Sequence, residues 1–169
     1  MEKDLRESNS KACVTIFTDG SASDGSVIDA MKPLIGLPVW IVIRLCTDDD
    51  TVCEYWDNVD QQLELEMDVL DDYISEAATV MQYNPWLNYG QPLHLLRESG
   101  CRIKAFDHLD EKKLSLNEIH SILPLILSCK LKDITHPDLD LGKFKDDVAS
   151  KLATVSTIFN PKTRKMSPW

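Results

Sequence analysis

The chain has 169 residues, of which 43% are hydrophobic, and its 28 acidic and 18 basic residues give a formal net charge of −10. A chain of this length can bury about two-thirds of its unfolded surface as one domain, and its apolar content is too high for a disordered protein. The acidic balance disfavours a protein that coats nucleic acid, because neutralising phosphates requires clustered lysines and arginines. It is compatible with binding a basic partner or a cation.

No segment has the pattern of a secretory signal or a membrane span. Residues 1–11 are charged and polar, and the longest apolar run, residues 37–43, is far shorter than the roughly 20 residues that cross a bilayer. The number of cysteines is odd and none form a C-x-x-C pair, which indicates reduced thiols, two of them in core strands. We therefore expect a cytoplasmic protein. The cysteines are Cys13, Cys46, Cys53, Cys101 and Cys129.

Residues 12–46 have the pattern of a strand, a helix and a second strand. Residues 12–17 and 39–46 are apolar, β-branched runs with little polar alternation, as in parallel strands covered on both faces. Between them, Ser26 and Asp29 have the spacing of a helix N-cap and its third-position carboxylate, and Pro33 should make the last turn irregular. Because parallel strands require a crossover connection, we expect the two strands to be parallel.

The next elements also have local signals. Thr47 and Asp50 repeat the capping pattern and predict a helix, and residues 63–70 alternate between apolar and acidic side chains, which predicts an edge strand. Asp71 or Asp72 should then cap a helix that ends near Tyr83. Four residues of that helix are expected to face inward: Ile74, Ala77, Ala78 and Met81.

The carboxyl-terminal half has mainly helical signals. We expect a short helix over residues 92–99, a short strand or linker over 103–106, and a helix opened by the capping box Ser115–Glu118 and bent at Pro124. A final helix is predicted over about 141–159, followed by a basic, non-helical tail. The predicted organisation is a polar, frayed arm (1–11), an α/β domain (12–84) and a mainly helical extension packed on it (85–169).

Acidic residues follow both predicted parallel strands. Ligands bind at the carboxyl edge of open α/β sheets, and the loops there carry Asp19, Asp24 and residues 48–50. Carboxylate and hydroxyl oxygens suit Mg²⁺, so Asp19 with Ser21 or Ser23 is a candidate partial shell, to which Asp48 is a weaker addition. The alternative interpretation is that residues 48–50 only cap a helix and that Asp24 belongs to a turn.

The segment Val14-Thr-Ile-Phe-Thr-Asp-Gly20, followed by a helix and a hydrophobic strand leading into Cys46-Thr-Asp-Asp-Asp50, resembles the second half of a von Willebrand factor A-type domain. The resemblance covers residues 11–83. It implies an open, doubly wound, Rossmann-like, mostly parallel sheet, in which Asp19 is the third-loop acidic residue of a metal-ion-dependent adhesion site. The family's first metal loop, D-x-S-x-S, and its second-loop threonine have no counterpart before Ala12. The resemblance therefore implies an incomplete domain with a helical extension.

A second resemblance competes with the first. Phe17-Thr-Asp-Gly-Ser-Ala22 is similar to the first-strand motif of ribonuclease H-type nucleases, in which the aspartate binds catalytic Mg²⁺. In that family hairpin-linked antiparallel strands follow the motif, whereas here a capped helix follows. We therefore expect a non-enzymatic module that binds a protein partner, with no nucleic acid and no membrane, and with a divalent cation such as Mg²⁺ assisting in the complete protein. The alternative is a fragment of a metal-dependent nuclease.

Overall fold

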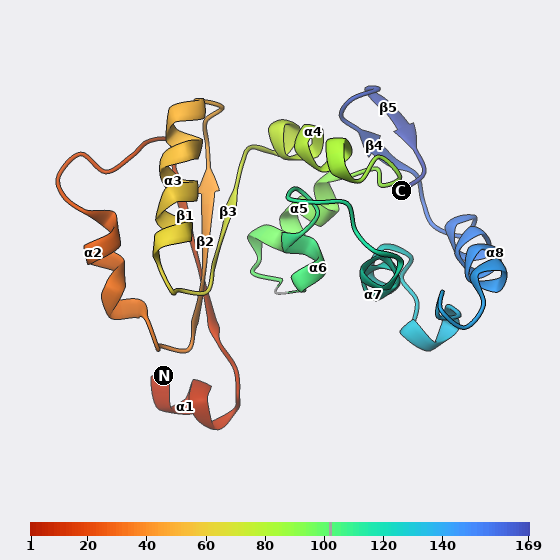
Figure 1. The fold of residues 1–169 in the computed structure, drawn as a ribbon, viewed down its shortest axis with the longest axis horizontal. Coiled ribbons are helices and arrows are strands. Elements are labelled where there is room, and N and C mark those ends of the chain that lie inside the picture. Colours follow the sequence, from red (N-terminus) through yellow and green to blue (C-terminus); the bar gives the residue numbers. More distant parts are fainter. Residues whose placement is uncertain (102) are drawn as a thin grey trace. The chain divides into compact units, whose positions relative to one another are not determined.

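The computed structural model describes every residue except Arg102 and divides into two units. The first unit comprises Met1–Glu76 and Leu95–Cys101, and the second comprises Ala77–His94 and Arg102–Trp169. A three-stranded parallel sheet lies in the first unit, and helices with a small antiparallel sheet make up the second (Figure 1). The prediction of a mixed α/β chain with carboxyl-terminal helices is therefore confirmed.

The sheet of the first unit has the order β1-β2-β3 and is parallel throughout. Strand β1 (Ala12–Thr18) pairs with β2 (Val39–Leu45) along its whole length, and β3 (Met67–Leu70) pairs with the other side of β2. The predicted parallel pairing of the first two strands is confirmed. The alternating segment before residue 67 was expected to be extended, but only β3 is, because Leu63 caps the preceding helix and is buried in the core.

The connection between β1 and β2 is a short helix that changes its winding before it ends. Helix α2 (Val27–Met31) begins at Ser26, whose hydroxyl accepts a hydrogen bond from the Asp29 amide at 3.2 Å. It continues as the 3-10 turn η1 (Lys32–Leu34), which contains Pro33. A proline lacks the amide hydrogen that an α-helix needs in its interior, so the predicted irregular turn is confirmed.

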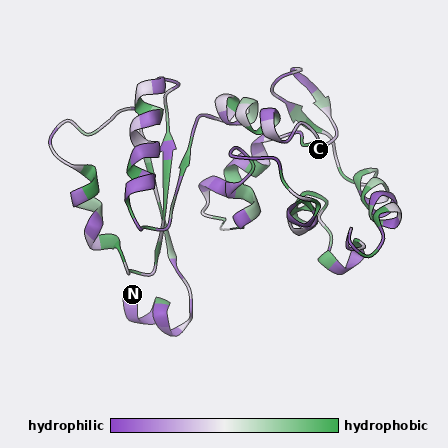
Figure 2. Ribbon diagram, viewed as in Figure 1, coloured by the Kyte–Doolittle hydropathy of each residue, from purple (hydrophilic) through white to green (hydrophobic). Residues whose placement is uncertain are grey.

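One face of the sheet carries the main hydrophobic core of the first unit. Alternate residues of β2 point to the face covered by α2 and by α3 (Asp50–Gln62), since successive side chains of a strand point to opposite sides. Figure 2 shows hydrophobic and hydrophilic stripes along α3, as expected for a helix with one buried face. The buried residues of this core are Met31, Ile41, Ile43, Leu45, Trp56, Val59, Leu63 and Met67.

Residues Leu95–Cys101 return to the opposite face of the same sheet. They form the end of α5 (Gln91–Glu98) and a turn at Gly100, where φ is +80°. A Cβ atom at Gly100 would lie 2.5 Å from the Cys13 sulfur and 3.1 Å from the Trp40 ring, so this close approach requires glycine. Trp40, Val42 and Leu70 are the buried hydrophobic residues of this face.

Helix α4 (Tyr73–Tyr83) begins as predicted but presents a different face to the core. The Asp72 carboxylate accepts a hydrogen bond from the Ile74 amide at 2.8 Å, which confirms the cap. Ala77 and Val80 are buried, whereas Ile74 is 56% exposed and Ala78 is also exposed, so the predicted inward face is wrong in part. Glu76 is also buried, at 3% exposure, so the buried face of α4 consists of Glu76, Ala77 and Val80.

Two segments that were not expected to be helical are helical. Residues of the polar arm form α1 (Glu2–Glu7), which local ion pairs and a hydrogen bond from Arg6 to the Gly36 carbonyl at 2.6 Å stabilise. The strand or linker predicted over residues 103–106 is instead α6 (Lys104–Asp107), whose Phe106 is fully buried. Short apolar runs do not distinguish a strand from a buried helical turn.

The second unit confirms the predicted capping box and corrects the final helix. Ser115 and Glu118 form the box at the start of α7 (Leu116–Ile126), which contains Pro124. A 3-10 turn, η2 (Leu131–Asp133), leads to α8 (Leu141–Leu152), which ends seven residues earlier than predicted. The remaining apolar residues belong to a hairpin of β4 (Ile158–Asn160) and β5 (Lys165–Ser167). Among the described residues, no helix is long and apolar enough to cross a membrane.

Candidate functional site

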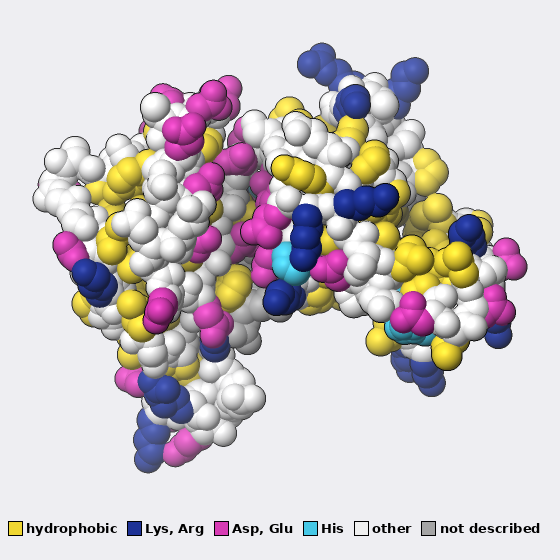
Figure 3. Space-filling model, in the orientation of Figure 1, with side chains coloured by type: hydrophobic (Ala, Val, Ile, Leu, Met, Phe, Trp, Pro, Cys, Tyr) yellow, Lys and Arg dark blue, Asp and Glu magenta, His cyan; other side chains and the backbone are white. Residues whose placement is uncertain are grey.

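Strands β1 and β2 end at one edge of the sheet, as the sequence predicts, and the structure adds the end of β3 to the same edge. Thr18 and Leu45 are register partners, and the Cys46 amide donates a hydrogen bond to the Thr18 carbonyl at 2.8 Å. Strand β3 ends beside Arg44 at the same edge. The loops that follow β1 and β2 begin side by side, and Figure 3 shows acidic side chains gathered around the start of α3. These loops bring exposed carboxylates to the edge: Asp19, Asp24, Asp48, Asp49 and Asp50.

The Thr18-Asp19-Gly20 turn is fixed by its own polar groups and by α3. The Thr18 hydroxyl donates to the Gly20 carbonyl at 3.1 Å, and the indole nitrogen of Trp56 donates to the same carbonyl at 3.0 Å. Trp56 is 6% exposed, so the turn is attached to a buried side chain of the core. This arrangement leaves the side chains of Asp19 and Ser21 exposed to solvent.

Asp49 is the residue that caps α3. Its carboxylate accepts hydrogen bonds from the amide and the hydroxyl of Thr51, which hold its pKa below the usual range. The prediction that Thr47 is the N-cap is wrong by two residues, because the Thr47 hydroxyl instead accepts from the Asp49 amide at 3.1 Å and closes the turn before the helix. The carboxylate of Asp49 therefore caps the amino-terminal end of α3.

The candidate cation ligands do not form a complete shell. Within the part of the chain that the structure describes, no group of three or more His, Cys, Asp or Glu side chains is placed to hold a metal ion. Asp19 and Asp48 follow neighbouring strands, but a hard cation needs about six oxygen ligands. A cation site at Asp19, Ser21 and Asp48 therefore stays a prediction that requires further ligands.

Cys53 lies on α3 and is partly buried. Burial and, to a smaller extent, the nearby carboxylates of Asp71, Asp57 and Asp50 together raise the pKa of its thiol to about 12. The thiolate is the nucleophilic form, so this thiol stays protonated and unreactive near neutral pH. Cys13 and Cys46, which were expected in the core, are exposed.

The face of the sheet opposite α3 carries an ion-pair network that the sequence analysis missed. Arg44 on β2 pairs with Glu98 at 2.5 Å and donates to the Asp71 carbonyl at 2.5 Å. Arg97, at 1% exposure, pairs with Glu76 and, at 3.3 Å, with Asp68 on β3. A signal existed, since Arg44 interrupts an otherwise apolar strand, but its partner is 54 residues away. The network attaches Leu95–Cys101 to the sheet.

Strand β1 exposes apolar side chains, which is unusual for a parallel strand. Val14 is 42% exposed, Ile16 38% and Phe17 65%. Among the described strands only β2 pairs with β1, so β1 forms an outer edge of the sheet. The expectation that this strand is covered on both faces is therefore wrong. We call the outer side of Ala12–Thr18 the β1 edge.

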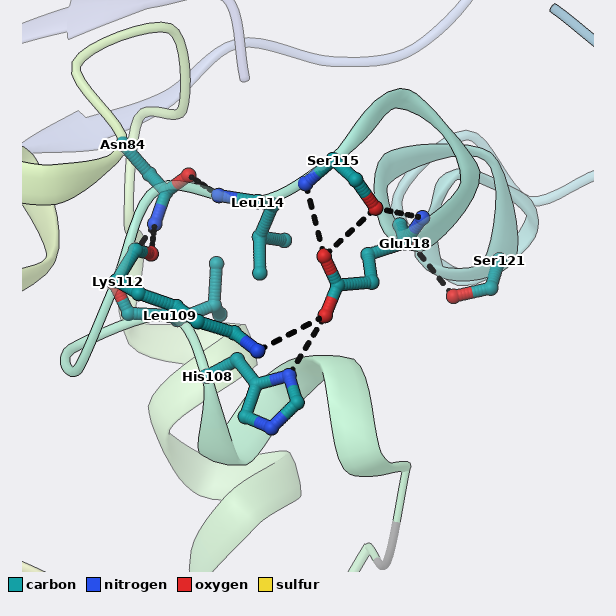
Figure 4. A network of polar contacts seen from close by, with 8 residues as sticks. All are labelled: Asn84, His108, Leu109, Lys112, Leu114, Ser115, Glu118 and Ser121. Carbon is teal, nitrogen blue, oxygen red and sulfur yellow. Dashed lines mark hydrogen bonds and ion pairs between the residues drawn. The ribbon is translucent and has the colours of Figure 1, made fainter.

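The second unit contains a separate polar network around Asn84 and Glu118 (Figure 4). Asn84 is fully buried, donates to the carbonyls of Leu109 and Lys112 at 2.8 Å each, and accepts from the Leu114 amide at 3.0 Å. Glu118 accepts from Ser115 and contacts His108 at 2.7 Å, and these interactions lower its pKa to about 2. These hydrogen bonds hold the segment before α7 in place, which is a structural role.

Comparison of the chain with protein-family models, curated proteins and solved structures gave no match in any of the three. The function is therefore inferred from the geometry of this chain alone.

Proposed function

We propose that the first unit is a protein–protein interaction module and that the β1 edge is its binding surface. The observation that carries the proposal is the exposure of Val14, Ile16 and Phe17 on an outer parallel strand. An outer strand presents a row of backbone N–H and C=O groups toward the open side, and an extended chain segment satisfies them. The partner is therefore expected to supply an extended segment with apolar side chains.

The pairing of β1 with β2 identifies the backbone groups that a partner would bind. The Ala12 amide donates to Pro38, and the Thr18 carbonyl accepts from Cys46. Because alternate residues of a strand direct their backbone groups to opposite sides, the N–H and C=O groups of Cys13, Thr15 and Phe17 point outward. The exposed side chains of Val14 and Ile16 on one face and of Phe17 on the other give such a partner apolar contacts.

The proposal retains the resemblance to an A-type domain with an open, doubly wound sheet. The parallel order β1-β2-β3 supports it, and it differs from the antiparallel hairpins expected of a ribonuclease H-type nuclease. In this interpretation Asp19 contributes to partner binding at the carboxyl edge. A cation there does not fit the described residues as a complete site, so a partner or a further segment would have to supply ligands.

Affinity capture with the full chain tests the module. The wild-type protein should capture at least one protein that Phe17→Lys does not, since a charge on the β1 edge opposes apolar contact. Leu139→Lys is the matched control, because Leu139 is 83% exposed and lies in the second unit. If every captured protein is retained by both variants, the β1 edge is not a binding surface. Metal-dependent cleavage of an RNA–DNA hybrid would favour the nuclease instead.

A further inference from the structure

The β1 edge is complementary to itself when two copies meet in antiparallel orientation. The segment Lys11-Ala-Cys-Val-Thr-Ile-Phe-Thr-Asp19 has a base at one end, an acid at the other and Thr15 at its centre. Thr15 is also the middle residue of β1, so pairing about Thr15 overlaps the whole strand. From this we propose that the partner of the β1 edge is a second copy of the chain, which joins it as an antiparallel neighbour through a twofold axis at Thr15.

The hydrogen-bonding positions fit this register. A residue pair of an antiparallel ladder exchanges two bonds when both residues direct their backbone groups toward the partner. Thr15 opposite Thr15 of the second copy satisfies this condition, and so does Cys13 opposite Phe17 of the second copy. The two parallel sheets would continue as one mixed sheet, an arrangement common in α/β proteins.

The side chains fit it as well. Val14 lies opposite Ile16 of the second copy at a position where side chains approach closely, so the apolar groups that are 42% and 38% exposed would cover each other. At both ends Lys11 lies opposite Asp19 of the other copy. Lys11 forms an ion pair with Glu66 of its own chain, which precedes β3 on the far side of β2, so pairing with Asp19 of the second copy would exchange this partner. Opposite charges at both ends fix the register, whereas the parallel orientation would place like charges together.

This inference rests on the proposed function, and charge exchange tests it. Sedimentation equilibrium of the full chain at about 0.15 M salt should show a dimer. This ionic strength screens the repulsion between two chains that each have a net charge of −10. Asp19→Lys and Lys11→Glu should each weaken the dimer by about tenfold or more, and the double variant should recover most of that loss. Leu139→Lys should leave the dimer unchanged. Circular dichroism of each variant checks that it folds.

Disulfide trapping tests the position of the axis. Oxidation of Thr15→Cys should give a covalent dimer, because directly opposite Cα atoms lie about 5.5 Å apart, within the range of a disulfide. Cys13 of one copy is four residues out of register with Cys13 of the other, about 13 Å along the strand, so the wild-type chain should not be trapped there. Trapping through Cys13 in preference to Thr15→Cys would overturn this register.

The outcomes separate this inference from the proposed function. A chain that stays monomeric at about 0.3 mM, or single charge variants whose combination restores nothing, would overturn the dimer. If that monomer still captures another protein in a way that Phe17→Lys abolishes, the module stands and only its partner is different. If capture is also independent of the β1 edge, both proposals fall.

Discussion

Arg97→Met should destabilise the first unit strongly, although it replaces one long side chain by another. Arg97 is 1% exposed and is the cation between Glu76, at 3% exposure, and Asp68, whose side chain is 12% exposed. Removing the guanidinium leaves two carboxylates that are shielded from water without that partner. Breaking a buried ion pair from one side costs about 3–5 kcal/mol of the free energy of unfolding.

The assay is urea unfolding of the full chain, followed by circular dichroism and by amide hydrogen exchange of β2 residues. The exchange measurement is needed because two units need not unfold together. Arg6→Met is the matched control, since Arg6 pairs with Glu2 on the surface, where an ion pair contributes less than about 1 kcal/mol. Combining Arg97→Met with Glu76→Met should recover part of the loss, because it removes one uncompensated charge.

A loss below about 1 kcal/mol for Arg97→Met, equal to that of Arg6→Met, would refute the reasoning. It would mean that the carboxylates are hydrated or protonated at little cost and that the network does not hold Leu95–Cys101 on the sheet. An equal loss in the second unit's amides alone would also contradict it, since all the partners lie in the first unit.

Three further predictions concern other parts of the chain. Asn84→Ala should cost at least about 3 kcal/mol in urea unfolding, because several buried partners lose their hydrogen bonds, whereas Asn58→Ala on the exposed face of α3 should cost less than about 0.5 kcal/mol. The pKa of Glu118 is lowered from 4.5 to about 2 in the folded chain, so its contribution is complete above pH 4.5 and is lost as the pH falls toward 2. In the Glu118→Gln variant the melting temperature should therefore change less with pH over this range than in the wild-type protein. An equal change of melting temperature with pH in both proteins would contradict this. Asp19→Ala should leave the free energy of unfolding within about 0.5 kcal/mol and should lower the amount of captured partner; equal capture would argue against a role of Asp19 in binding.

The sequence alone was sufficient for the elements whose signals are local. The caps at Ser26 and Ser115 use a side chain and an amide three residues apart, so their residue spacing is enough to predict them. The apolar run over residues 39–43 of β2 predicts a strand buried on both faces, and the helix between β1 and β2 predicts their parallel pairing. These features alone predict that Asp19 and Asp48 lie at one edge of the sheet.

Only the tertiary structure decided what covers each face and edge of that sheet. The partners of Arg44 and Arg97 lie 54 and 21 residues away, and nothing in the local pattern connects them. The apolar sequence of β1 is the same whether a neighbouring strand pairs with its outer side or not, so its place at the edge is known only from the order β1-β2-β3. Local periodicity records which side chains are apolar, whereas the chain's return path determines which of them stay exposed, and here it leaves Val14, Ile16 and Phe17 available to a partner.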